Sequence, residues 1–150
     1  MSDAQVTIST ANKGFNLEEL DSDVQNTFKV VLEKDGAGEP LYGLICVDKN
    51  SSQYRIASNT IRANRIQRSA TRGKDLDTTT AEGAAQRVAD IDSDNRAVAL
   101  AVTVGWFGML ANGVPVDFNP VALPKLFDKK PTWQDAVSEE LENRANFTKG

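Results

Sequence analysis

Three aspartates at alternate positions, Asp90, Asp92 and Asp94, form the pattern in this sequence that comes nearest to a site of chemistry. Alternating carboxylates of this kind open the calcium-binding loop of an EF-hand. Such a loop also needs a glycine at its sixth position and a bidentate glutamate at its twelfth. The residues at these two positions are Asn95 and Ala101. The sequence therefore argues against a calcium site.

No other group of residues predicts catalysis. The chain contains no histidine, the commonest general base near neutral pH and the usual partner of a serine or cysteine nucleophile. Its single cysteine, Cys46, lies in an apolar, strand-like stretch, where a buried and inert thiol is expected. Gly36 and Gly38 lack the spacing of a phosphate-binding loop. The sequence thus predicts a protein without catalytic residues, bound metal or cofactor.

The composition is typical of a single globular domain. The chain has 150 residues, of which 40% are hydrophobic and 25% charged, and its formal net charge is −4. A chain of this length can bury enough surface to fold without disulfides or structural metal. Its negative charge gives no general attraction to nucleic acid or to an anionic membrane. The first residues, MSDAQVTIST, lack the features of a signal peptide, so a cytoplasmic location is expected.

The most apolar stretch is AVALAVTVGWFGML, residues 97–110. It is shorter than the roughly 20 residues that a membrane-spanning helix requires. Alanine, leucine and methionine favour a helix, although valine and the aromatic residues also suit a strand. We predict a core helix that ends near Ala111 and is closed by Asn112 and Gly113. Trp106 is expected to be largely buried, with a hydrogen-bond partner for its indole N–H.

The order of the predicted elements indicates an α+β fold. Residues 1–25 form a polar N-terminal segment that is expected to be mobile or docked by a few apolar side chains. Alternating apolar residues predict a β-hairpin over 26–47, with its turn at Asp35 and Gly36. The helical part is expected over 52–147. Together, a hairpin or small antiparallel sheet followed by a mostly helical bundle makes residues 26–150 one domain.

The predicted helix over 52–72 is the basic element of the chain. At the helical repeat, Ile56, Ala63, Ile66 and Ala70 share one face, which we expect to be the buried one. Arginines occupy the other side: Arg55, Arg62, Arg65, Arg68 and Arg72. They could form a solvated face, pair with acidic segments of the same chain, or bind nucleic acid. The acidic C-terminal helix is the expected complement within the chain.

Caps predict the remaining helices. Thr78, Thr79 and Thr80 offer caps for a helix that either breaks at residues 92–94 or, as we favour, continues through them. Asn119 followed by Pro120 predicts the start of a short helix, because proline suits the first helical position. Thr132 is the expected cap of the final, acidic helix.

Four segments together resemble the tail assembly chaperones of long-tailed bacteriophages. They are the hairpin with GEPLYGLICV, the arginine-rich helix after DKNSSQY, the segment VTVGWFGMLANGVPVDFNP, and the terminal WQDAVSEELENRANF. The resemblance implies a non-enzymatic protein that binds the long tape-measure protein and keeps it soluble while the tail tube assembles around it. It also implies a host-cytoplasmic location, absence from the finished virion and the tail tube protein as a further partner.

Client contacts are expected on the arginine-rich and terminal helices, because both carry apolar residues beside charged ones. The candidate partner-binding residues are Tyr54, Ile61, Arg62, Arg65, Arg68, Trp133 and Leu141. Self-association of the chain is a further expectation. Two other classes of function remain open. One is a virion component, such as a head–tail connector or tail-end protein, and the other is a nucleic-acid-binding regulator that uses the arginine face.

Overall fold

A computed structural model describes residues 17, 26–72 and 76–149 of the chain, with side chains up to residue 144. The predicted N-terminal segment, 1–25, therefore lies outside the described residues, apart from Leu17. The side chain of Leu17 is exposed. No described helix is both long enough and apolar enough to cross a lipid bilayer.

An antiparallel sheet of three strands forms the base of the fold. Its strand order is β1 (Thr27–Lys34), β2 (Pro40–Val47) and β3 (Thr103–Phe107). The predicted hairpin is confirmed, because β1 and β2 are antiparallel neighbours joined by a short turn. Within that turn, the Asp35 carboxylate accepts two backbone N–H bonds, and Gly38 takes a positive φ of 85°. This local hydrogen bonding explains why a short sequence pattern predicted the hairpin.

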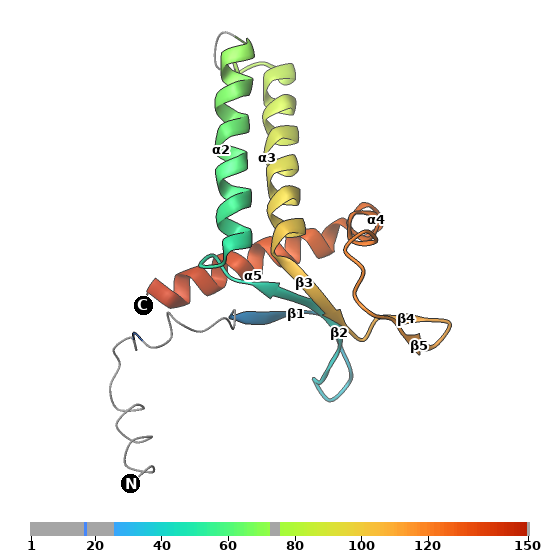
Figure 1. Ribbon diagram of the computed structural model, residues 1–150. Helices are drawn as coiled ribbons and strands as arrows, with labels where there is room; N and C mark the ends of the chain where they lie inside the picture. Colours follow the sequence, from blue (N-terminus) through green and yellow to red (C-terminus); the bar gives the residue numbers. More distant parts are fainter. Residues whose placement is uncertain (1–16, 18–25, 73–75, 150) are drawn as a thin grey trace.

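Two long helices extend away from the sheet. Helix α2 (Ser52–Arg72) matches the predicted range. Helix α3 (Ala81–Val102) begins after the three candidate caps, and Thr80 is the one that caps it, since its Oγ1 accepts the N–H of Gly83. Helix α3 also continues through residues 92–94 as predicted. Figure 1 shows α2 and α3 side by side, forming a helical hairpin that stands on the rest of the molecule.

The predicted end of this helix near Ala111 is wrong. The chain leaves the helix at Val102 and continues as strand β3, so the apolar stretch 97–110 is divided between helix and strand. Thr103 marks the change, and its hydroxyl donates to the carbonyl of Ala99 in the last helical turn. The β-branched and aromatic residues that follow Val102 pair with β2, and this tertiary contact overrides the helical preference.

The residues after β3 form a small second hairpin, with β4 (Leu110–Ala111) paired to β5 (Val114–Pro115). Asn112 and Gly113 take left-handed conformations, with φ of 52° and 79°, but they form the hairpin turn and do not close a helix. Trp106 is half-buried, less than predicted. Its indole N–H donates to the carbonyl oxygen of Val116 at 2.8 Å, which supplies the expected partner.

Helices α4 (Leu123–Lys129) and α5 (Pro131–Lys149) complete the chain. Asn119 accepts the N–H of Val121 in a turn, but α4 starts later than predicted. Helix α5 begins at Pro131, so Thr132 lies inside the helix and is not its cap. Proline suits this position because it has no N–H group, and the N–H groups of the first helical residues have no hydrogen-bond acceptor within the helix.

The core lies where the sheet meets α3, α4 and α5. Its buried apolar side chains are Phe28, Val30, Leu44, Cys46, Val47, Ala99, Val102, Leu123, Phe127, Val137 and Leu141. Helix α5 contacts β1, α3 and α4, and it crosses near the base of the helical hairpin (Figure 1). The molecule is thus an α+β protein with an antiparallel sheet and a mostly helical remainder, as predicted.

Candidate partner-binding cleft

Helix α2 is oriented the opposite way to the prediction. The predicted buried face is turned to solvent, since Ile56 is 63% exposed and Ile66 is 72% exposed. The buried residues of the helix are Ala57 and Ile61, which lie on the side facing α3. The apolar face therefore does not set the orientation of this helix. The arginines of α2 set its orientation instead, because they form ion pairs with carboxylates of α3.

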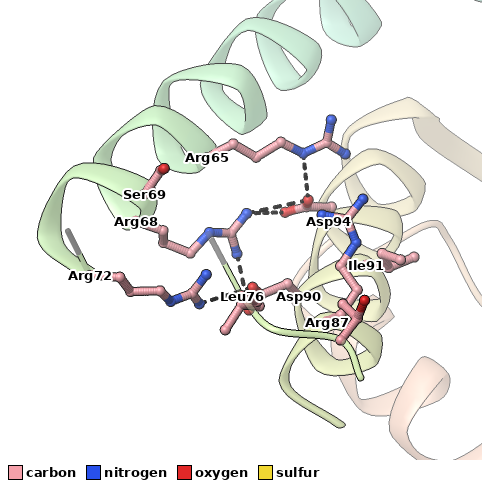
Figure 2. A pocket seen from close by; sticks show the side chains of 10 residues that line it. Arg65, Arg68, Ser69, Arg72, Leu76, Arg87, Asp90, Ile91 and Asp94 are labelled. Atoms are coloured by element: carbon pink, nitrogen blue, oxygen red, sulfur yellow. Dashed lines mark hydrogen bonds and ion pairs between the residues drawn. The ribbon is translucent and has the colours of Figure 1, made fainter. Parts of the chain in front are cut away.

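Aspartates of α3 pair with the arginines of α2 (Figure 2). Arg65 Nε lies 3.1 Å from Asp94 Oδ2, and Arg68 lies 3.3 Å from the other oxygen of the same carboxylate. Arg72 lies 3.0 Å from Asp90, which Arg68 also approaches at 3.5 Å. Asp94 is buried, and a buried carboxylate requires such partners. Pairing within the chain is thus confirmed for three of the five arginines, Arg65, Arg68 and Arg72.

The prediction that the acidic terminal helix pairs with the arginines of α2 is wrong, because α3 supplies the carboxylates. Among the described residues, α5 contributes one ion pair, between Glu142 and Lys49 at 2.6 Å. Asp90 and Asp94 are spaced one helical turn apart, so both project from α3 toward α2. The alternate aspartates that resembled a calcium loop in sequence are therefore separated on the helix, and two of them bind arginine.

The environment of Asp90 lowers the pKa of its carboxyl group. A hydrogen bond from Gln86 is the largest cause, followed by one from Arg72. A lowered pKa in the folded state means that the ionised form stabilises the fold above the ordinary pKa of about 4. That contribution is lost only as the pH falls through the lowered value. The ion pairs that Asp90 forms with α2 therefore persist at neutral pH.

A cleft of about 290 Å³ lies at the junction of α2, α3 and α5. It brings together most of the predicted partner-binding residues: Tyr54, Ile61, Arg62, Arg65 and Leu141. Ile61 and Leu141 are 7% and 3% exposed and form part of its apolar floor. Arg62, Arg65 and Glu142 also line the cleft, and all three residues are exposed. The accessible lining of the cleft is therefore mostly polar, with charges of both signs around a small apolar floor.

Two predicted residues lie outside this cleft. Arg68 lines a neighbouring pocket of about 420 Å³ between α2 and α3, which shares Arg65 and Asp94 with the cleft (Figure 2). Trp133 is partly buried against the core, and its ring lies 5.9 Å from that of Tyr42. Trp133 is therefore a packing residue at the start of α5.

Several residues that line the cleft were not predicted from the sequence. Val98 belongs to the apolar stretch that was predicted to be covered by the rest of the chain. Ser138 and Asn95 are polar residues that no sequence pattern distinguishes from ordinary surface positions. Their place in the cleft depends on how α3 and α5 meet, and only the tertiary fold determines that.

The residues that could bind a metal ion are dispersed in the described part of the chain, and the one cysteine is buried. Over the ranges that the structure covers, no three His, Cys, Asp or Glu side chains are close enough together to hold a metal ion. Burial raises the pKa of the Cys46 thiol to about 11, so the thiol stays protonated at neutral pH. Its sulfur lies 3.6 Å from the hydroxyl oxygen of Thr103. This cysteine is a core residue, as predicted.

Comparisons with family models, with curated proteins and with solved structures give no match. The chemistry of the cleft and the sequence resemblance therefore carry the functional argument.

Proposed function

We propose that this protein is a tail assembly chaperone of a long-tailed bacteriophage and that it acts without turning over a substrate. Its client would be the tape-measure protein, which it keeps soluble while the tail tube is built. The sequence resemblance supports this proposal, because it extends over the hairpin, the arginine-rich helix, the β3 region and the terminal helix. The tube protein is a further proposed partner. The proposed location is the host cytoplasm, with no copies in the finished virion.

The cleft at the junction of α2, α3 and α5 is the observation that carries the binding argument. Ile61, Val98 and Leu141 form a small apolar part of its lining, and polar and charged side chains form the rest. A helical client can place an apolar side chain on this small patch while its polar side chains meet the surrounding charges. Several copies bound along one long client would add avidity without requiring tight binding at each cleft.

The pairing of α2 with α3 weakens the case for a nucleic-acid-binding regulator. Arg65, Arg68 and Arg72 are engaged by carboxylates, so their charge is largely neutralised where it would have to meet phosphate. A virion component remains the main alternative. Mass spectrometry of purified particles separates the two, because a component is present at stoichiometric levels and the proposed chaperone is absent.

Filling the cleft tests the proposed client site. Ser138 lies on its wall and is half-buried, so Ser138→Tyr places a bulky ring in the space that the client would occupy. We expect this variant to lose at least about tenfold in affinity for the tape-measure protein, or about 1.4 kcal/mol. The measurement is a pull-down titration with the co-expressed client.

The matched control is Asn143→Tyr, which adds the same ring to an exposed position of the same helix. Residue 143 does not line the cleft, so this variant should bind like the parent. If folded Ser138→Tyr bound the client as tightly as the parent does, the client would have to bind elsewhere on the protein.

A further inference from the structure

The α2–α3 hairpin carries apolar side chains on its outer sides. On α2 these are Ile56, Ala63, Ile66 and Ala70, which we call the α2 outer stripe; all four are exposed. On α3 the corresponding exposed residues are Ala81, Ala85 and Val88, the α3 outer stripe, of which Val88 is 67% exposed. Single exposed aliphatic residues are normal, but a row of them along each helix of a projecting hairpin indicates two interaction surfaces, one on each outer side.

The end of the hairpin furthest from the sheet has almost no core of its own. Ala57 and Ile61 are the buried residues described in α2, and both lie in the half nearer the sheet. In α3, Gly83 is the one described residue between its start and Asp94 that is buried. Partly exposed ion pairs hold the two helices together there, and such pairs contribute about 0–1 kcal/mol each. Helices in proteins gain most of their stability by packing an apolar face, so this end requires a covering surface.

The charges beside the two stripes are complementary. Arg55 and Arg62 flank the α2 outer stripe, and α2 contains no acidic residue. Glu82 and Asp92 lie beside the α3 outer stripe and are exposed. Within the described part of the chain, none of these four side chains has a charged partner. One copy of the protein therefore carries both halves of a complementary surface.

We propose that the α2 outer stripe of one copy packs against the α3 outer stripe of a second copy, with Arg55 and Arg62 facing Glu82 and Asp92. At about 100° per residue, each stripe lies on the side of its helix turned away from the other helix of the hairpin. The two stripes therefore cannot satisfy each other within one chain. The contact is heterologous, and contacts of this type build rings or open arrays.

Charge reversal tests this contact without any client, so its outcome is independent of the proposed chaperone function. We expect the full chain at tens of micromolar to sediment in analytical ultracentrifugation with at least twice the monomer mass. Arg55→Glu with Arg62→Glu should yield monomers, and so should Glu82→Arg with Asp92→Arg. An equimolar mixture of the two double variants should regain the parent's mass, because opposite charges again face each other across every contact.

The matched control for the arginine reversal is Lys34→Glu with Lys125→Glu. It changes the net charge by the same amount at exposed positions on other elements, and it should keep the parent's mass. Restored assembly in the mixture also shows that both double variants are folded. A monomeric parent, a control that dissociates like the arginine variant, or a mixture that stays monomeric would each overturn the proposal.

Discussion

Replacing Phe127 with alanine is expected to lower the free energy of unfolding by about 3–5 kcal/mol. Phe127 is 1% exposed and lies on α4, where it packs into the core shared by the sheet and α5. Truncation removes the buried ring and leaves a cavity that the surrounding backbone can fill only in part. Urea unfolding followed by circular dichroism measures the effect as a lower midpoint at an unchanged slope.

The control for this prediction is Val121→Ala, two residues before the start of the same helix. Val121 is 75% exposed, so its truncation should change the free energy of unfolding by no more than about 0.5 kcal/mol. If Phe127→Ala were equally harmless, α4 would not be part of the core and its packing against α5 would be wrong.

Replacing Gly43 with alanine is expected to destabilise the protein by about 1–3 kcal/mol, although it adds only one methyl group. Gly43 lies in the central strand β2, opposite Val31 of β1 and Phe107 of β3. An added Cβ would overlap with the carbonyl oxygen of Val30 and lie 2.8 Å from the ring carbon Cε1 of Phe107. Because the carbonyl belongs to the strand backbone, the sheet itself must shift to make room.

Gly36→Ala provides the matched control, since it makes the same substitution in the turn between β1 and β2. No atom lies within 4 Å of a Cβ built there, and Gly36 does not have a positive φ. The variant should be neutral or slightly stabilising, because alanine restricts the unfolded chain more than glycine does. Thermal melts that give Gly43→Ala and Gly36→Ala the same midpoint would contradict the pairing of the three strands.

The sequence predicted those elements whose signals are local. The β1–β2 hairpin followed from alternating strands and a turn, and the start of α3 followed from the three threonines that offered caps, of which Thr80 is the cap. Strand β3 could not be predicted in this way, because residues 103–107 continue an apolar stretch that also suits a helix. Their strand conformation depends on the edge of β2, which lies more than fifty residues earlier in the chain.

The orientation of α2 shows a second limit of sequence analysis. An apolar stripe normally marks the buried side of a helix, but Ile66 faces solvent and Arg68 faces α3. The deciding residues, Asp90 and Asp94, belong to another helix, and their position opposite the arginines follows from the hairpin geometry. The apolar periodicity of α2 alone carries no information about these two aspartates.

Only some residues of the candidate cleft could be predicted, because the cleft forms where separate helices meet. Tyr54, Ile61 and Leu141 were identified as apolar residues beside charges on two helices, and the tertiary fold brings these helices together. Ser138 carries no sequence signal, because a half-buried serine and a surface serine look alike in sequence. Trp133 has the residue type favoured at interfaces, but the fold uses it for packing.

Co-expression with the tape-measure protein of the same phage tests the central claim most directly. The quantity to measure is the fraction of tape-measure protein that stays in the supernatant after lysis and centrifugation, with and without this chain. The proposed function predicts that the client is mostly insoluble alone and becomes soluble, bound to this chain, when the two are made together. A tape-measure protein that is equally soluble in both cases would contradict the chaperone function.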